Sequence, residues 1–193
     1  YLVFSDRTLN LRLVDPATGK ITNVDHATSS EIRSYDFSPD SRWITYTLQG
    51  SNGKSVIWVY EIATGKKTAL TNGTYSDYSP VFSRCGNYIF FTSDRDYNLT
   101  RSSFESDYLY TRAARLYALA LTTKSPKIFK DKNDVEPVTE KSTAATPDET
   151  KNKKSGKAAE TPASTEKKSV KTEIDFAGIN NRVTVLPGEA GNY

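Results

Sequence analysis

SPDSRWI at residues 38–44 returns as SRCGNYI at residues 83–89, an offset of 45 residues. A second pair, DPATGK at residues 15–20 and EIATGK at residues 61–66, repeats at an offset of 46 residues. A period of this length is typical of repeat proteins whose unit is a sheet of four strands. Because one such unit cannot close a core alone, the fold must come from several units stacked together.

Short runs rich in β-branched and aromatic residues lie between the turns. Several of these runs are apolar nearly throughout, which is typical of strands covered on both faces, as in the stacked blades of a β-propeller. Trp43, Trp58 and Phe90 fall in such runs. Turn residues interrupt the pattern too often for helices. We therefore predict an all-β fold, a partial β-propeller built from four-stranded antiparallel blades.

The turns between these runs carry residues with special backbone geometry. Pro16 and Pro39 each occupy the second position of a tight turn, where the fixed φ of proline is favourable. Gly19 and Gly86 follow as residues that adopt the left-handed conformation without strain. Both repeated motifs are therefore predicted to be the turns of hairpins.

Composition divides the chain into three parts. Residues 1–129 hold about three repeats, with a polar and aromatic loop inserted at 97–114. Residues 130–172 are rich in Lys, Glu, Thr, Ser, Ala and Pro, and such a stretch is predicted to be a disordered insertion. Residues 173–193 are strand-like again and are predicted to start the next blade. Closed propellers have four to eight blades, so we expect an interior piece of a longer protein.

The overall charge and hydropathy exclude several classes of function. The 26 basic and 23 acidic residues leave a net charge of +3, without the concentrated basic patch typical of nucleic-acid binding. No apolar run approaches the roughly 20 residues that cross a bilayer. Cys85 is the single cysteine, which rules out an internal disulfide framework. We expect neither a nucleic-acid partner nor a membrane partner.

Residues that could carry catalysis are few. His26, the single histidine, follows a turn motif and is interpreted as an exposed structural residue rather than a base. No G-x-S-x-G motif occurs, and one His with one Cys cannot form a zinc site. Cys85 lies at a turn where its repeat counterpart is Asp40. We therefore predict no catalytic residue, no metal site and no cofactor in this chain.

Two clusters remain open to more than one interpretation. The acidic and basic residues at 94–96 could coordinate a cation, but an ion-paired strand end is the interpretation that we favour. The inserted loop offers Tyr97, Phe104, Tyr108 and Tyr110 as candidates for a rim that binds peptide substrates. The alternative is that these aromatic rings only pack the loop onto its blade.

Two longer segments resemble the tricorn protease family. Residues 93–121 resemble a blade with an aromatic and polar loop between two strands. Residues 173–193, EIDFAGINNRVTVLPGEAGNY, are similar to the family's Ile-Asp-Phe-x-Gly-Ile-x-x-Arg-Val segment and its Ala-Gly-Asn-Tyr continuation. In this family a Lys- and Glu-rich stretch commonly precedes this segment, and residues 130–172 occupy that place here. The family has two propellers. Residues 173–193 resemble the second, seven-bladed one more than the first, but the sequence does not decide between them.

The resemblance implies that the parent protein is a serine-type peptidase that degrades peptides. Its other parts would be the rest of the propellers, a PDZ-like module and a catalytic domain absent from this chain. This chain would be non-catalytic, with the propeller gating or steering peptide substrates. The resemblance further implies that the full-length protein is a homo-oligomer. We expect it in the cytoplasm, with the periplasm or secretion as the alternative that exported homologues leave open. Two alternatives stay open: a TolB-like propeller that serves as a protein-binding scaffold, and the propeller of a prolyl-oligopeptidase-type enzyme.

Overall fold

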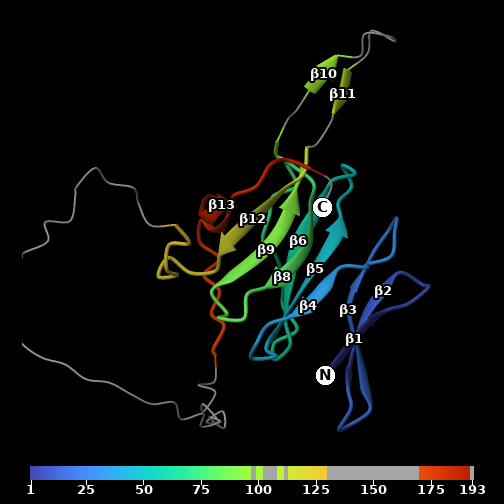
Figure 1. Ribbon diagram of the computed structural model, residues 1–193. Coiled ribbons are helices and arrows are strands. Elements are labelled where there is room, and N and C mark those ends of the chain that lie inside the picture. Colours follow the sequence, from blue (N-terminus) through green and yellow to red (C-terminus); the bar gives the residue numbers. More distant parts are fainter. Residues whose placement is uncertain (97–98, 102–107, 111–112, 130–169, 192–193) are drawn as a thin grey trace, which may run out of the picture. The chain divides into compact units, whose positions relative to one another are not determined.

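Antiparallel sheets make up the structure, a computed structural model that describes residues 1–96, 99–101, 108–110, 113–129 and 170–191 (Figure 1). The chain divides into two compact units, residues 1–126 with 169–193, and residues 127–168. Only residues 127–129 of the second unit are described. Among the described residues, no helix has the length and apolar character needed to span a bilayer.

Three sheets carry the fold, in agreement with the predicted all-β class. The first has the order β1 (Leu2–Ser5), β2 (Asn10–Asp15), β3 (Lys20–His26). The second has the order β4 (Tyr35–Phe37), β5 (Trp43–Gln49), β6 (Ser55–Glu61), β7 (Lys67–Ala69). The third has the order β13 (Val183–Val185), β12 (Arg115–Ala120), β9 (Tyr88–Ser93), β8 (Asp77–Phe82). A separate pair, β10 (Leu99–Arg101) and β11 (Tyr108–Tyr110), and a short 3-10 helix, η1 (Ile179–Arg182), complete the described elements.

The first repeated motif forms the same turn in the second and third sheets. The Oγ atoms of Ser38 and Ser83 accept the backbone N–H groups of Trp43 and Tyr88, at 2.9 and 3.0 Å. Residue 41 in one turn and Gly86 in the other both have positive φ. In both turns the serine hydroxyl accepts the first N–H group of the following strand. The motif therefore recurs wherever this turn leads into such a strand.

The second repeated motif closes hairpins in the first and second sheets. The N–H groups of Gly19 and Gly65 donate to the carbonyls of Asp15 and Glu61, both at 2.8 Å. Each glycine adopts the left-handed conformation, with φ of 69° and 70°. In each turn a threonine hydroxyl also donates to the carboxylate of the acidic residue. The hairpin prediction for this motif is confirmed.

The second sheet is covered on both faces. Along β5, Trp43 belongs to a core shared with the third sheet, whereas Ile44 and Tyr46 belong to a core shared with the first sheet. Along β6, Val59 faces the former core and Tyr60 the latter. This alternation explains why these strands read as continuous apolar runs, and it confirms the prediction of stacked blades.

A buried polar cluster joins the first and second sheets. Asp25 at the end of β3 accepts a hydrogen bond from the Tyr46 hydroxyl at 2.7 Å and from Lys67 Nζ at 2.6 Å. Burial, and then the hydrogen bond to this carboxylate, raise the pKa of Tyr46 well above its usual range. The cluster therefore helps to fix the register between the two sheets, beside the apolar core that they share.

The last strand differs from the sequence-based prediction. Residues 173–193 were expected to start the next blade, but Val183–Val185 forms β13 and pairs antiparallel with β12 as the fourth strand of the third sheet. The order of strands in the sequence does not reveal this pairing, because β13 follows its partner only after a long intervening segment.

The last three residues of the predicted disordered insertion have a defined structure. Residues 170–172 lie within the described part of the chain, and Thr172 is 0% exposed. Its backbone N–H donates to the carboxylate of Asp40. The rest of this insertion, residues 130–169, lies outside the described residues.

We predict that Tyr46→Phe destabilises the fold by about 1–3 kcal/mol, because it removes a buried hydrogen bond to a carboxylate. Urea denaturation measures the change in the free energy of unfolding. Tyr35→Phe is the matched control: the Tyr35 ring packs against the same core, and its hydroxyl has no hydrogen-bond partner among the described residues. Equal effects of the two substitutions would contradict the role of the Asp25 cluster.

Candidate functional site

His26 occupies the exposed end of β3. Its Nδ1 atom lies 3.1 Å from the Oδ1 atom of Asn10, and its backbone N–H donates to Asp25. These contacts are those of a structural residue at a strand end. Among the described ranges, no three His, Cys, Asp or Glu side chains gather closely enough to hold a metal ion.

The four aromatic candidates for peptide binding remain predictions. Tyr97 and Phe104 lie outside the described residues. Tyr108 and Tyr110 belong to β11, which pairs antiparallel with β10 in the register Leu99↔Tyr110 and Arg101↔Tyr108. The inserted segment therefore contains a pair of antiparallel strands, where the sequence predicted a loop.

The charged residues after β9 each bind a different partner. Asp94 accepts the Tyr78 hydroxyl at 3.0 Å, and Asp96 forms an ion pair with Arg115. Burial, followed by the hydrogen bond to Asp94, raises the pKa of Tyr78 to about 12. Arg95 forms the third contact, to Asp77. The ion-paired strand end that the sequence favoured is confirmed.

Arg95 and Asp77 form the most buried ion pair of the third sheet that the described residues contain. The Nη2 atom of Arg95 lies 3.1 Å from the Oδ2 atom of Asp77, whose side chain is 1% exposed. The Oγ atom of Ser93 joins them: it accepts from Arg95 Nε at 3.0 Å and donates to Asp77 Oδ1. No sequence pattern marked Asp77, because a single carboxylate on a strand has no spacing signal.

Cys85 is exposed at the turn between β8 and β9. Its Sγ atom lies 3.3 Å from the Oγ atom of Ser83. Partial burial alone would raise the pKa of the thiol, but hydrogen bonds from Ser83 and Asn87 hold it below its usual range. The thiol therefore interacts with residues of its own turn, where the sequence analysis placed it.

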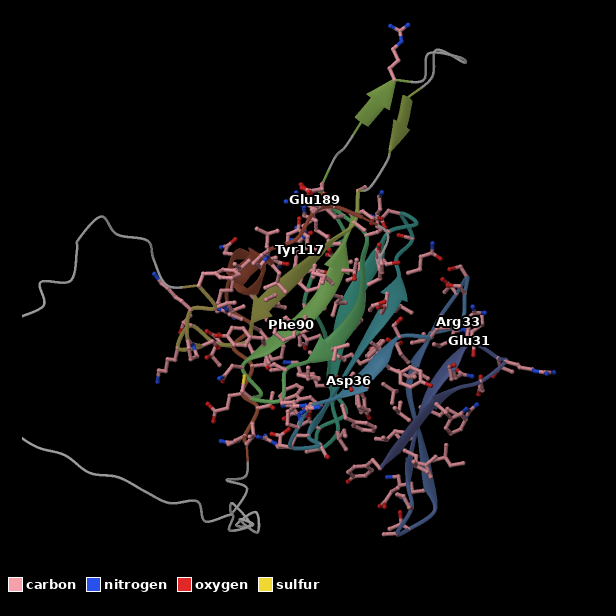
Figure 2. The ribbon with its side chains drawn as sticks, in the orientation of Figure 1. Glu31, Arg33, Asp36, Phe90, Tyr117 and Glu189 are labelled. Atoms are coloured by element: carbon pink, nitrogen blue, oxygen red, sulfur yellow. The ribbon has the colours of Figure 1, made fainter. Side chains whose placement is uncertain are left out.

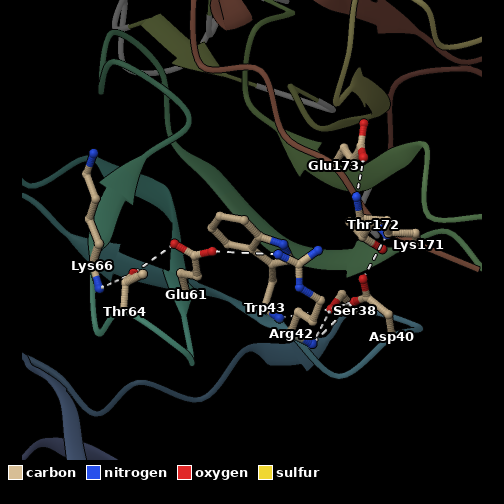
Figure 3. A network of polar contacts seen from close by, with 10 residues as sticks. All are labelled: Ser38, Asp40, Arg42, Trp43, Glu61, Thr64, Lys66, Lys171, Thr172 and Glu173. Carbon is tan, nitrogen blue, oxygen red and sulfur yellow. Dashed lines mark hydrogen bonds and ion pairs between the residues drawn. The ribbon is translucent and has the colours of Figure 1, made fainter.

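The terminal segment, residues 170–186, contacts the turns of two sheets. The Thr172 N–H donates to the Oδ2 atom of Asp40 at 2.8 Å, in the second sheet's turn (Figure 3). In the third sheet's turn, a Cβ atom added to Gly86 would lie 2.8 Å from Thr172 Oγ1 and 2.9 Å from Val170. The terminal segment is therefore fitted closely against both repeated turns.

Apolar side chains of the terminal segment extend the core between the second and third sheets. The rings of Phe176 and Trp43 meet edge-on, with their centroids 6.1 Å apart. Ile174 and Phe176 pack against this core, and Ile179 is buried within it. The two aliphatic residues and the phenylalanine of the Ile-Asp-Phe-x-Gly-Ile pattern thus contribute to packing.

Arg182 holds the terminal segment to the end of β12. Its guanidinium donates to the carbonyls of Ala120, Ala177 and Asp175, and it lies 3.5 Å from the Asp175 carboxylate. A planar group with five donors suits several carbonyls at once. Arg182 therefore satisfies backbone acceptors where the strand ends. A lone arginine in a sequence gives no indication of this role.

We predict that Gly86→Ala costs about 1–3 kcal/mol more stability than Gly53→Ala. Both glycines have positive φ, of 71° and 73°, so both substitutions introduce the same backbone strain. An added Cβ meets nothing within 4 Å at Gly53, whereas at Gly86 it meets the terminal segment. Chemical denaturation measures the difference, and equal losses at both positions would show that the terminal segment is not packed on this turn.

We also predict that the terminal segment loosens in acid. Burial would raise the pKa of Asp40, but hydrogen bonds from Ser38, Thr172 and Arg42 outweigh it and lower the pKa. A lowered pKa means that the stabilisation is complete above the unfolded value of about 3.9 and is lost as the pH falls through the folded value.

Hydrogen-exchange protection factors of the amides at 171–173 should therefore hold from pH 7 to 5 and fall below about pH 4. Asp40→Asn should remove the same protection at neutral pH. Asp15→Asn is the control, because that carboxylate binds only its own turn. If Asp40→Asn leaves the protection of these amides unchanged, the Asp40 carboxylate does not hold the terminal segment.

Comparisons with known proteins agree with this architecture. The family model of the tricorn protease second beta propeller domain matches residues 1–193. Tricorn protease homolog 1 of Streptomyces coelicolor is 24% identical over 185 residues, which are 94% of this chain and 15% of that protein. The tricorn protease of Thermoplasma volcanium is 23% identical over 127 residues, which are 63% of this chain and 12% of that protein.

The fold is also that of a solved structure. The crystal structure of the tricorn protease superposes with a TM-score of 0.68 at 19% sequence identity, over 99% of this chain and 16% of that one. The chain thus spans less than a fifth of the length of each of these relatives. Since the family model covers every residue, the chain belongs to the family of the tricorn protease second beta propeller domain.

Proposed function

We propose that this chain is a non-catalytic part of a tricorn-like serine peptidase, in which the propeller steers peptide substrates to a catalytic domain elsewhere in the same polypeptide. The family match supports the first part of this proposal. The observation that carries the non-catalytic role is the use of the charged side chains: Asp25, Asp77, Asp40 and Arg182 all hold sheets, turns or strand ends together.

The steering role rests on the architecture of propellers, in which blades surround a central channel. β4 and β8 are the edge strands of the second and third sheets, and each is the first strand of its sheet in the sequence. We propose that these edges face the channel. Arg33, two residues before β4, has an 83% exposed side chain and would lie at the mouth of the channel. Figure 2 shows Arg33 beside Glu31, its partner at 3.4 Å.

A size-dependent obstruction tests this proposal in the full-length protein. Arg33→Cys, in a background without other exposed thiols such as Cys85, is labelled with a bulky polyethylene-glycol maleimide. We predict that the label lowers kcat/KM for a peptide of about 20 residues by roughly tenfold, and leaves a short chromogenic peptide within about twofold.

Lys66→Cys with the same label is the matched control. Lys66 is also exposed, but it precedes β7, the edge strand at the opposite side of the same sheet. Its label should leave the cleavage of both peptides unchanged. If the label on Arg33→Cys changes the cleavage of neither peptide, the steering role is wrong. If the full-length protein cleaves no peptide at all, the result favours a protein-binding scaffold.

A further inference from the structure

Three aromatic rings surround the guanidinium of Arg95. Its Cζ atom lies 5.4 Å from the centroid of Tyr75, 5.4 Å from that of Phe91 and 5.3 Å from that of Tyr117. Each distance falls within the range of about 6 Å in which a cation is attracted to a ring face. The rings come from three segments, the approach to β8, β9 and β12. The fold thus gathers them from across the third sheet.

The floor of this enclosure is negatively charged. Asp77 is 1% exposed at its side chain, and it meets the Arg95 guanidinium through both carboxylate oxygens, at 3.1 and 3.3 Å. Ser93 supplies a further acceptor to Arg95 Nε. A carboxylate buried this deeply is strongly unfavourable without a cation beside it. The enclosure therefore requires a positive charge, whatever group supplies it.

The shape of the enclosure selects among cations. A guanidinium is planar, stacks on aromatic faces and presents a fork of donors, whereas an ammonium is a compact, strongly hydrated point charge. Three ring faces together with two acceptors, Asp77 and Ser93, match the planar group. We infer that Tyr75, Phe91, Tyr117, Asp77 and Ser93 form a guanidinium-binding site, which the chain fills with its own Arg95.

The tether explains how the site acts. Arg95 lies two residues after Ser93, just past the end of β9, and its side chain is 21% exposed. A ligand attached to the chain has a high effective concentration, so free ligands do not compete with it. The filled site holds residues 94–96 on the third sheet. Arg95 is thus a positioning residue for the chain that leaves β9.

Chemical complementation in the full-length protein tests this inference. Arg95→Ala removes the internal ligand and leaves the enclosure open to a small ion. Hydrogen exchange of the peptide amides of β8 and β9 should then become roughly tenfold faster, because the Asp77 carboxylate has lost its cation. Guanidinium chloride at about 10 mM should restore protection to within about twofold, whereas equal ammonium chloride or urea should not.

Matched variants separate a specific site from a general salt effect. Arg33→Ala removes an exposed guanidinium, and guanidinium chloride should change nothing there. Adding Tyr117→Leu to Arg95→Ala should abolish the rescue, because it removes one ring face. Arg95→Lys keeps the positive charge but lacks the planar guanidinium group. Hydrogen exchange as slow in this variant as in the natural protein would overturn the inference. Equal rescue by ammonium or urea would overturn it as well.

The test stands even if Arg95→Ala folds poorly. Refolding from urea is then compared with and without about 10 mM guanidinium chloride, with ammonium chloride as control. A higher yield of soluble protein with guanidinium alone supports the site. A yield that is equal under all conditions refutes it.

Discussion

Burial of the second sheet on both faces is the constraint on which the structure depends. Along β5 and β6, successive side chains point into different cores, one shared with the first sheet and one with the third. Neither core can form without this sheet, and so neither neighbouring sheet could bury its inner face alone. Apolar contact has little directional preference. The polar contacts at the sheet boundaries, those of Asp25 with Tyr46 and of Asp36 with the Phe82 N–H, therefore supply the registers.

The repeated turns connect this packing to the terminal segment. Each turn begins with a serine that accepts the next strand's N–H and contains a left-handed residue three positions later. The terminal segment contacts both of these turns, with Thr172 on Asp40 and Val170 on Gly86. The residues that define the family resemblance are thus largely residues that hold blades together. This agrees with the structural role that we propose for this chain.

Local sequence patterns made the fold predictable, whereas contacts between residues far apart in the sequence could not be predicted. The 45-residue period and the apolar runs around Trp43 and Trp58 predicted stacked sheets, because strands covered on both faces lose their alternation. Ser41 was not expected in the left-handed conformation, although its repeat counterpart Gly86 was. Asp77, Arg95 and Arg182 carry no periodic signal, since each meets partners that the fold alone brings near. The aromatic candidates for peptide binding stay predictions, because Tyr97 and Phe104 lie outside the described residues.

The pairing of β13 with β12 has a consequence for how this family changes over time. The second sheet joins its last two strands through residues 62–66, whereas the third sheet uses residues 121–182 for the corresponding connection. The entropic cost of closing a chain segment grows only with the logarithm of the number of residues in it, so a roughly twelvefold longer connection costs about 2 kcal/mol more. Arg182 and the terminal segment hold the returning chain against the second and third sheets, so the length of the connection has little effect on the stability of the blade. Insertions and deletions can accumulate there while the blade keeps its four strands.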